Sequence, residues 1–152
     1  METLERIIAE HPFFLDLDPK FTELMVGCAS NVRFKRGDFI FREGDPANTF
    51  YLLREGKVAV ETVAPQHGPI TVATLEEGEI LGWSWLLAPY RWKHQARVQD
   101  DMRAIALDGK CLRTKCEENH DLGYEILKRF ARIIEQRLES TRLQLLDVYA
   151  LR

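Results

Sequence analysis

The stretch from Phe34 to Val58 has the sequence FKRGDFIFREGDPANTFYLLREGKV, and it decides the fold. Short apolar and β-branched runs alternate in it with glycines, and the same texture continues over residues 32–107. Glycine fills the positive-φ positions of tight turns without the steric penalty that other residues pay. The glycines of this region are Gly37, Gly44, Gly56, Gly68, Gly78 and Gly82. The pattern predicts many short strands joined by tight turns.

Two segments of this β region show the alternation of a paired strand. Residues 58–62 have the sequence VAVET, and residues 70–74 have the sequence ITVAT. They are separated by a short connection with a proline at each end, Pro65 and Pro69. Together they predict a hairpin with one buried face.

Helical signals flank the β region on both sides. Before it, residues 2–28 carry apolar helical faces, and Asp18 followed by Pro19 is typical of an N-cap and a first helical residue. After it, residues 121–148 lack proline and are rich in helix-forming residues. We expect one domain spanning 1–152. Its parts are a helical N-terminal segment (1–30), a β region (31–109), a short helix (111–120) and a long helix (121–150).

A seven-residue repeat runs along the long helix and predicts an a/d seam over about three heptads. Its members are Leu127, Ala131, Ile134, Leu138, Thr141, Leu145 and Val148. Such a seam favours a parallel homodimer, in which the polar Thr141 would set the register. The other interpretation, that the whole helix folds back on its own domain, stays open.

A second apolar face of the same helix lies beside the seam. It consists of Ile126, Phe130 and Ile133. This face would stay exposed after simple dimerisation, so we expect it to pack on the β region of the same subunit. Arg137 continues the face by spacing, but we expect it to be solvated.

Composition and charge bound the functional classes. The 152 residues include 21 basic and 24 acidic side chains, so the formal net charge of −3 offers no positive field for nucleic acid. The start lacks the features of a secretory signal, and the longest largely apolar run, residues 80–89, is too short to span a bilayer. We expect a soluble cytoplasmic protein without membrane contact.

The cysteines and histidines match no metal or catalytic pattern. Cys28, Cys111 and Cys116 make an odd count, with neither iron–sulfur nor zinc spacing, and are expected to be reduced packing or surface thiols. The four histidines are scattered, and no nucleophile elbow, HExxH or P-loop pattern occurs. The sequence therefore predicts no metal site, no catalytic residue and no enzyme.

The stretch 34–58 resembles the first half of the cyclic-nucleotide-binding domain of catabolite activator-type regulators, kinase regulatory subunits and gated channels. The resemblance continues through residues 11–14, 78–82 and 102–107 and the long helix, and so covers nearly the whole chain. It implies a mainly β fold with flanking helices, in which a double-stranded β-helix (a jelly-roll-like β-roll) precedes a long C-terminal dimerisation helix. It does not extend to a helix-turn-helix, so no direct DNA binding by this chain is expected.

The resemblance also implies a ligand pocket in a cassette at about residues 80–98. In that family a short helix points backbone N–H groups at a cyclic phosphate, a glutamate binds the ribose and an arginine pairs with the phosphate. Aligning Gly82 with the family glycine places Trp83 at the glutamate position and His94 at the arginine position. Each lost charge-assisted hydrogen bond weakens binding by roughly 1.5–3 kcal/mol, so tight binding of cyclic AMP is not expected.

Aromatic and basic residues replace these anchors. All three tryptophans lie between residues 83 and 92, beside a short helix expected to begin near Ser84. Indole rings stack on planar ligands, and neighbouring cations meet anions. The candidate ligand-binding residues are Gly82, Trp83, Ser84, Trp85, Arg91, His94 and Gln95. Two interpretations stay open: a modified pocket, or a collapsed one filled by Trp83 and Trp85. Arg97 is interpreted either as a phosphate contact or as a solvated strand residue. The resemblance also places Arg137 and Thr141 where the family helix often caps the ligand base, although we expect Arg137 to be solvated and Thr141 to set the register.

These features predict a regulatory module. A nucleotide or another small anionic or planar ligand would enter the cassette, and the long helix and the dimer would signal to a protein partner of unknown identity. No cofactor is assigned beyond such a ligand, which would be a cyclic nucleotide or another small anion. The alternatives are a ligand-free dimeric adaptor with a tryptophan-filled pocket, and the effector domain of a transcription regulator if the chain is a truncated one.

Overall fold

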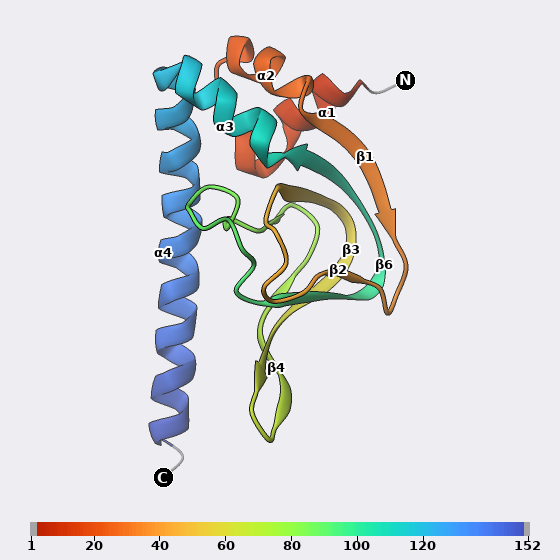
Figure 1. Cartoon of the computed structure of the whole chain (residues 1–152), viewed down its shortest axis with the longest axis vertical. Coiled ribbons are helices and arrows are strands. Elements are labelled where there is room, and N and C mark those ends of the chain that lie inside the picture. The colour runs from red at the N-terminus through yellow and green to blue at the C-terminus, as the bar shows by residue number, and fades with distance from the viewer. Residues whose placement is uncertain (1–2, 151–152) are drawn as a thin grey trace.

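The computed structural model describes residues 3–150, which form a β-roll with α1, α2 and α3 gathered at one end and α4 running along one side (Figure 1). The N-terminal helices are α1 (Leu4–Glu10), the 3-10 helix η1 (Pro12–Phe14) and α2 (Pro19–Val26). The strands are β1 (Ala29–Phe34), β2 (Phe39–Phe41), β3 (Thr49–Ala64), β4 (Gly68–Leu75), β5 (Ile80–Leu81) and β6 (Gln95–Asp108). The C-terminal helices are α3 (Gly109–Glu118) and α4 (His120–Ala150). The predicted class, mainly β with flanking helices and a long C-terminal helix, is confirmed.

The N-terminal helices begin where the sequence signals lie. The Asp18 carboxylate accepts a hydrogen bond from the Lys20 N–H at 3.0 Å, and Pro19 is the first residue of α2. Proline is tolerated there because its missing N–H would have no partner inside the helix. The predicted cap is therefore confirmed.

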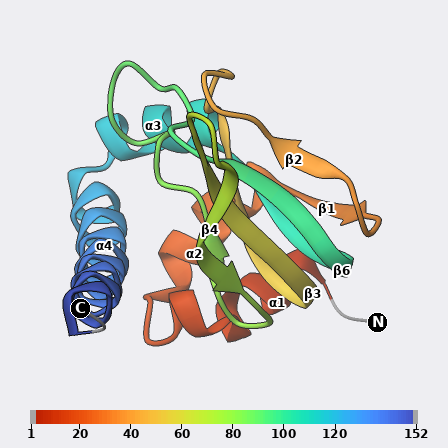
Figure 2. The same cartoon turned by 90° about the horizontal axis from the view of Figure 1, so that it is seen from below.

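The strands pair antiparallel in one sheet that curls into the roll (Figure 2). The order is β1-β6-β3-β4, with β2 pairing β6 and β5 pairing β3. The register between β3 and β6 shifts around Gly56, which has a φ of 100°. A Cβ on Gly56 would come within 2.6 Å of the Asp101 carbonyl oxygen, so the two strands approach closely only because this residue is glycine.

The predicted hairpin is confirmed, but its single buried face is not. In β3 and β4, Val60 pairs with Ala73 and Thr62 pairs with Ile70. Residues 58–61 are buried on both faces of β3. On the second face, the Glu61 side chain is buried because Gln95 and Arg97 of the neighbouring strand β6 bind its carboxylate.

Two apolar clusters stabilise the fold. One fills the roll and includes Leu53, Val98 and Met102. The other joins the end of the roll to the helices, where Phe50 and Phe130 meet edge to face with ring centroids 5.2 Å apart. Burial of these apolar side chains is the main driving force for docking the helices on the roll.

The first part of α4 packs against the roll of the same chain. Leu122, Ile126 and Phe130 are fully buried in the second cluster, and Ile133 packs against its edge. The expectation that this face packs on its own subunit is confirmed. The preceding helix α3 begins two residues earlier than expected, because the Asp108 carboxylate caps it by accepting from the Cys111 N–H at 3.0 Å.

The expectation of three reduced thiols is wrong for two of them. Cys28 and Cys111 form a disulfide across a sequence separation of 83 residues, with their Cα atoms 5.7 Å apart. They meet because β1 pairs with the end of β6, which places Ala29 opposite Leu107, just before α3 begins at Gly109. Cys116 is a free thiol, and burial raises its pKa to about 11.

The part of the chain that the structure describes contains no helix long and apolar enough to cross a membrane.

Candidate ligand-binding site

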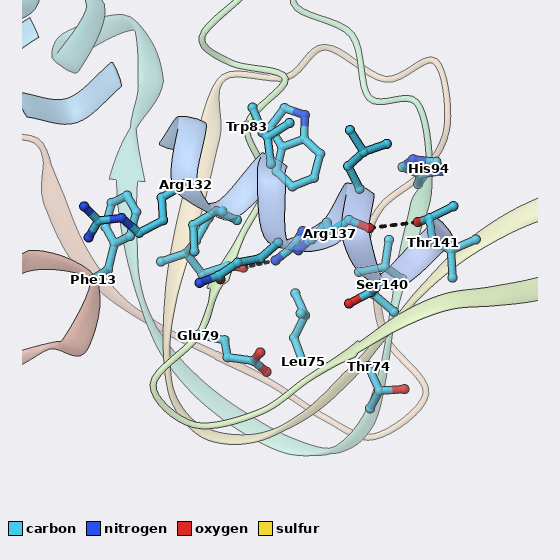
Figure 3. A pocket seen from close by; sticks show the side chains of 18 of the residues that line it. Phe13, Thr74, Leu75, Glu79, Trp83, His94, Arg132, Arg137, Ser140 and Thr141 are labelled. Carbon is cyan, nitrogen blue, oxygen red and sulfur yellow. Dashed lines mark hydrogen bonds between the residues drawn. The ribbon is translucent and has the colours of Figure 1, made fainter. Parts of the chain in front are cut away.

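A groove of about 1000 Å³ lies between α4 and the roll (Figure 3). Val60, Leu75 and Ile80 line its wall on the side of β3, β4 and β5, and Arg137 and Thr141 line its wall on α4. The cassette, residues 80–98, contributes Trp83 and His94 to the same groove. Ligand sites in proteins are typically concave and mostly apolar with a few polar groups, as this one is.

The expected short helix at Ser84 does not form. Residues 84–86 make a turn, in which the Leu86 N–H donates to the Trp83 carbonyl oxygen at 3.1 Å. Pro89 explains the difference, because it has no N–H to donate and it restricts Ala88 to non-helical conformations. Ser84 is half-buried in this turn and does not line the groove.

The three tryptophans have different roles. Trp85 is fully buried and stacks on Phe50 with ring centroids 4.9 Å apart. Trp92 stacks on Phe41 at 3.7 Å inside the roll. Trp83 is half-buried and faces the groove. Trp85 and Trp92 therefore complete the core, and Trp83 stays available to a ligand.

Gly82 is required for backbone geometry. Its φ is 99°, and a Cβ at this position would overlap the ring of Trp92. It does not line the groove. The structure therefore gives Gly82 a packing role rather than a contact with a ligand.

His94 lines the groove as the alignment implied. Its Nδ1 lies 3.3 Å from the hydroxyl oxygen of Thr62. Burial lowers the pKa of His94, opposed by the charge of Glu43 and assisted by that of Arg137. The neutral imidazole is thereby favoured in the folded protein.

The remaining polar candidates turn away from the groove. Arg91 is exposed and donates to the Gly44 carbonyl oxygen at 3.2 Å. Gln95 is buried and donates to the carboxylate of Glu61 at 3.0 Å. Neither lines the groove, because alternation along the start of β6 directs Gln95 to the opposite face from His94.

Glu61 forms a buried polar cluster that the sequence did not reveal. Arg97 donates two hydrogen bonds to its carboxylate, the shorter at 2.8 Å. The hydrogen bond from Arg97 lowers the pKa of Glu61, and burial acts in the opposite direction. Arg97 is therefore paired with Glu61 rather than free to contact phosphate, while its side chain stays 40% exposed, in keeping with the interpretation as a solvated strand residue.

Arg137 is a groove residue that sequence reasoning misjudged. It is half-buried, and its Nη2 donates to the Ile80 carbonyl oxygen at 2.7 Å. Its guanidinium also lies 4.8 Å from the ring centroid of Trp83. The expectation of a solvated side chain is wrong. The signal was present, because Arg137 follows Phe130 and Ile133 at helical spacing on the face that packs on the roll.

A family sequence model described as "Cyclic nucleotide-binding domain" matches residues 31–119. The chain belongs to the cyclic nucleotide-binding domain family. The matched residues include the cassette with Trp83 and His94. In the structure, this cassette and α4 face one another across the groove.

Relatives share the cyclic nucleotide-binding fold along most of this chain. The CRP-like cAMP-activated global transcriptional regulator of Mycobacterium tuberculosis is 23% identical over 145 residues, which are 95% of this chain and 63% of that protein. A crystal structure from Geobacter metallireducens GS-15 has 28% identity and a TM-score of 0.80, covering 91% of this chain and 99% of that one. A cyclic nucleotide-binding domain from Methylobacillus flagellatus KT has 19% identity and a TM-score of 0.82, covering 94% and 83%.

The a/d residues of α4 lie outside the packed face of the helix. Leu127, Leu138, Leu145 and Val148 are exposed, as are Ala131 and Thr141, and Ile134 is half-buried. Of these residues, Ile134, Leu138 and Thr141 also line the groove. The Thr141 hydroxyl donates to the Arg137 carbonyl oxygen at 2.9 Å. Within the described chain, most of this seam therefore has no apolar cover.

Proposed function

We propose that residues 1–152 act as a single regulatory module, which senses a nucleotide or another small anionic or planar ligand in the groove. The observation that carries this proposal is that cassette and helix line one groove: Trp83 and His94 on one side, Arg137 and Thr141 on the other. A ligand between them would contact both elements. Its binding would therefore favour one position of α4 over another, as a ligand-driven switch requires.

The chemistry of the groove supports a planar ligand that differs from the family's usual one. Trp83 offers a half-buried indole face where a glutamate is expected, and His94 stands where an arginine is expected. Without the glutamate and the arginine, cyclic AMP would bind weakly. The indole ring of Trp83, in contrast, favours a ligand with a planar ring that can stack on it. The volume of about 1000 Å³ also leaves room for a ligand larger than one mononucleotide.

The exposed a/d seam supports a homodimer as the signalling form. Two copies of α4 packed in parallel would cover Leu138, Leu145 and Val148 in both subunits. A shift of α4 in one subunit would then move the other, and the changed surface would be offered to a protein partner. This role is regulatory, in keeping with the family, and involves no catalytic step.

A thermal-shift panel tests ligand sensing. Purified protein is melted with cyclic AMP, cyclic GMP, cyclic di-GMP, linear nucleotides and small aromatic carboxylates. A compound at a hundred times its dissociation constant adds about 2.7 kcal/mol of stability, which raises the melting temperature measurably. A saturable shift with at least one compound is expected, and it should be reduced by Trp83→Ala.

A gain-of-function variant tests the placement of the cassette. Trp83→Glu combined with His94→Arg restores both family anchors, so calorimetry should detect tighter cyclic AMP binding than in the parent. A folded double variant without any gain would contradict the alignment. A flat panel with a folded dimer would instead favour the ligand-free adaptor.

A further inference from the structure

No arginine or lysine of the cassette lines the groove, so the cassette places no permanent positive charge beside a ligand. Arg91 is exposed and bonded to Gly44, and Arg97 is neutralised by Glu61. Lys93 is exposed and does not line the groove. His94 does line it, but burial lowers its pKa and favours the neutral ring. A negative charge on a ligand therefore has no fixed partner on this side.

The α4 wall differs, because Arg129, Arg132 and Arg137 all line the groove. Arg129 is bonded to the Phe13 carbonyl oxygen, whereas Arg137 brings a permanent charge into the middle of the groove. Its guanidinium lies next to Trp83, and Figure 3 shows it between Trp83 and Glu79. A guanidinium has five N–H donors, and Arg137 uses one of them to donate to the Ile80 carbonyl oxygen. The side chain thus keeps most of its donor capacity for another acceptor.

No carboxylate neutralises Arg137 among residues 3–150. Glu79 is the nearest acidic influence on it, yet its carboxylate accepts a hydrogen bond from the Glu76 N–H at 2.6 Å and forms no ion pair with Arg137. Burial lowers the pKa of Arg137, which reflects the unfavourable transfer of its charge out of water. A half-buried cation without a counterion is unfavourable unless an anion completes the site.

We propose that Arg137 is the anion-binding residue of the groove, so that the negative charge of the ligand is bound by α4 and its planar part stacks on Trp83. The ligand class is therefore an aromatic molecule carrying phosphate, sulfonate or carboxylate. This inference rests on the proposed sensing function. It moves charge recognition from the roll to the helix that would carry the signal, so binding of the anion acts on α4 directly.

Inorganic pyrophosphate isolates the charge from the planar part of the ligand. Its binding is followed by NMR through the Nε–H signals of the arginines and by calorimetry. We expect a saturable shift of the Arg137 signal and little change at Arg91. Arg137→Gln should weaken pyrophosphate binding at least about tenfold, because a charge-assisted hydrogen bond is lost. The pyrophosphate affinity of Arg137→Lys should lie between those of the parent protein and Arg137→Gln, since lysine keeps the charge and lacks the planar guanidinium.

Arg91→Gln is the matched control, because it removes an equal charge from the cassette outside the groove. It should change the dissociation constant of pyrophosphate by less than about twofold. Unchanged binding by folded Arg137→Gln, or no binding by the parent protein, overturns the anion site. A flat nucleotide panel with Arg137-dependent pyrophosphate binding would remove the sensing function and leave the anion site standing. Nucleotide binding that does not depend on Arg137 would support the sensing function and overturn the anion site.

Discussion

The first and second halves of α4 place similar apolar residues in opposite surroundings. In the first half, Leu122, Ile126 and Phe130 are fully buried against the roll and the N-terminal helices. In the second half, Leu138 is 68% exposed and Leu145 is 55% exposed. Arg137 lies at the boundary, where its guanidinium donates a hydrogen bond to the Ile80 carbonyl oxygen of the roll.

This difference separates the stability of the fold from its association. Apolar side chains buried in the first half stabilise each subunit, because they leave water when the chain folds. Those of the second half stay in water until another surface covers them. One helix therefore serves the core at one end and, in the dimer that we propose, an interface at the other, with Arg137 between the two at the groove.

The largest expected effect breaks the association and leaves the fold. Leu138→Asp with Leu145→Asp places two carboxylates in the seam of each subunit, where each leucine would contribute about 1.5–3 kcal/mol on burial. The dissociation constant of the dimer, measured by analytical ultracentrifugation, should rise by more than about a hundredfold. The circular dichroism spectrum should not change.

Leu143→Asp is the matched control for the seam variant. Leu143 is also exposed, at 51%, but it lies on the opposite side of α4 from the a/d residues. It should leave the dimer intact. Equal dissociation by this variant, or a monomeric parent protein, would contradict the assignment of the seam.

The next effect concerns the first half. Phe130→Ala removes a fully buried ring that contacts Phe13 and Phe50, with centroid distances of 5.0 Å and 5.2 Å. Its free energy of unfolding in urea should fall by about 3–5 kcal/mol. Leu143→Ala, in the same helix but exposed, should change it by about 0.5 kcal/mol or less. Similar losses in both variants would show that the two halves are equally packed.

The smallest expected effect concerns the pH dependence of stability through His94, which lies in the groove at the boundary between the two halves of α4. Burial lowers the pKa of His94 below its ordinary value of 6.5, as it does for His11. Below that value the unfolded chain binds more protons than the folded one, so stability falls as the pH is lowered from 6.5 towards the folded-state pKa. His94→Gln should reduce this loss in urea unfolding, whereas replacing the exposed His67 should not. An unaltered pH profile would show that the groove end of α4 is fully open to water.

Several local features were predictable because their causes lie within a few residues of sequence. The glycines of the roll, the Asp18 cap, the β3–β4 hairpin and the packed face of Ile126 and Phe130 all follow from spacing and residue type. The short helix at Ser84 failed for an equally local reason, because Pro89 follows too closely. This prediction was wrong because the effect of Pro89, which is visible in the sequence, was not taken into account.

Other features of the site could not be read from local patterns. Glu61 meets Gln95 and Arg97 only through the register of β3 against β6, over more than thirty positions of sequence. Whether Trp83 or Trp85 faced the groove depended on how the cassette turns over Phe50. These placements are decided by pairing between distant strands.

The sequence by itself determined the class of fold, the existence of α4 and its heptad seam, since periodicity and glycine placement act through the local backbone. Only the tertiary structure decided the Cys28–Cys111 disulfide and the position of Arg137 against Ile80 and Trp83. The physical reason is that these contacts join residues tens of positions apart. Their distance is set by the curl of the whole sheet and the docking of α4 upon it.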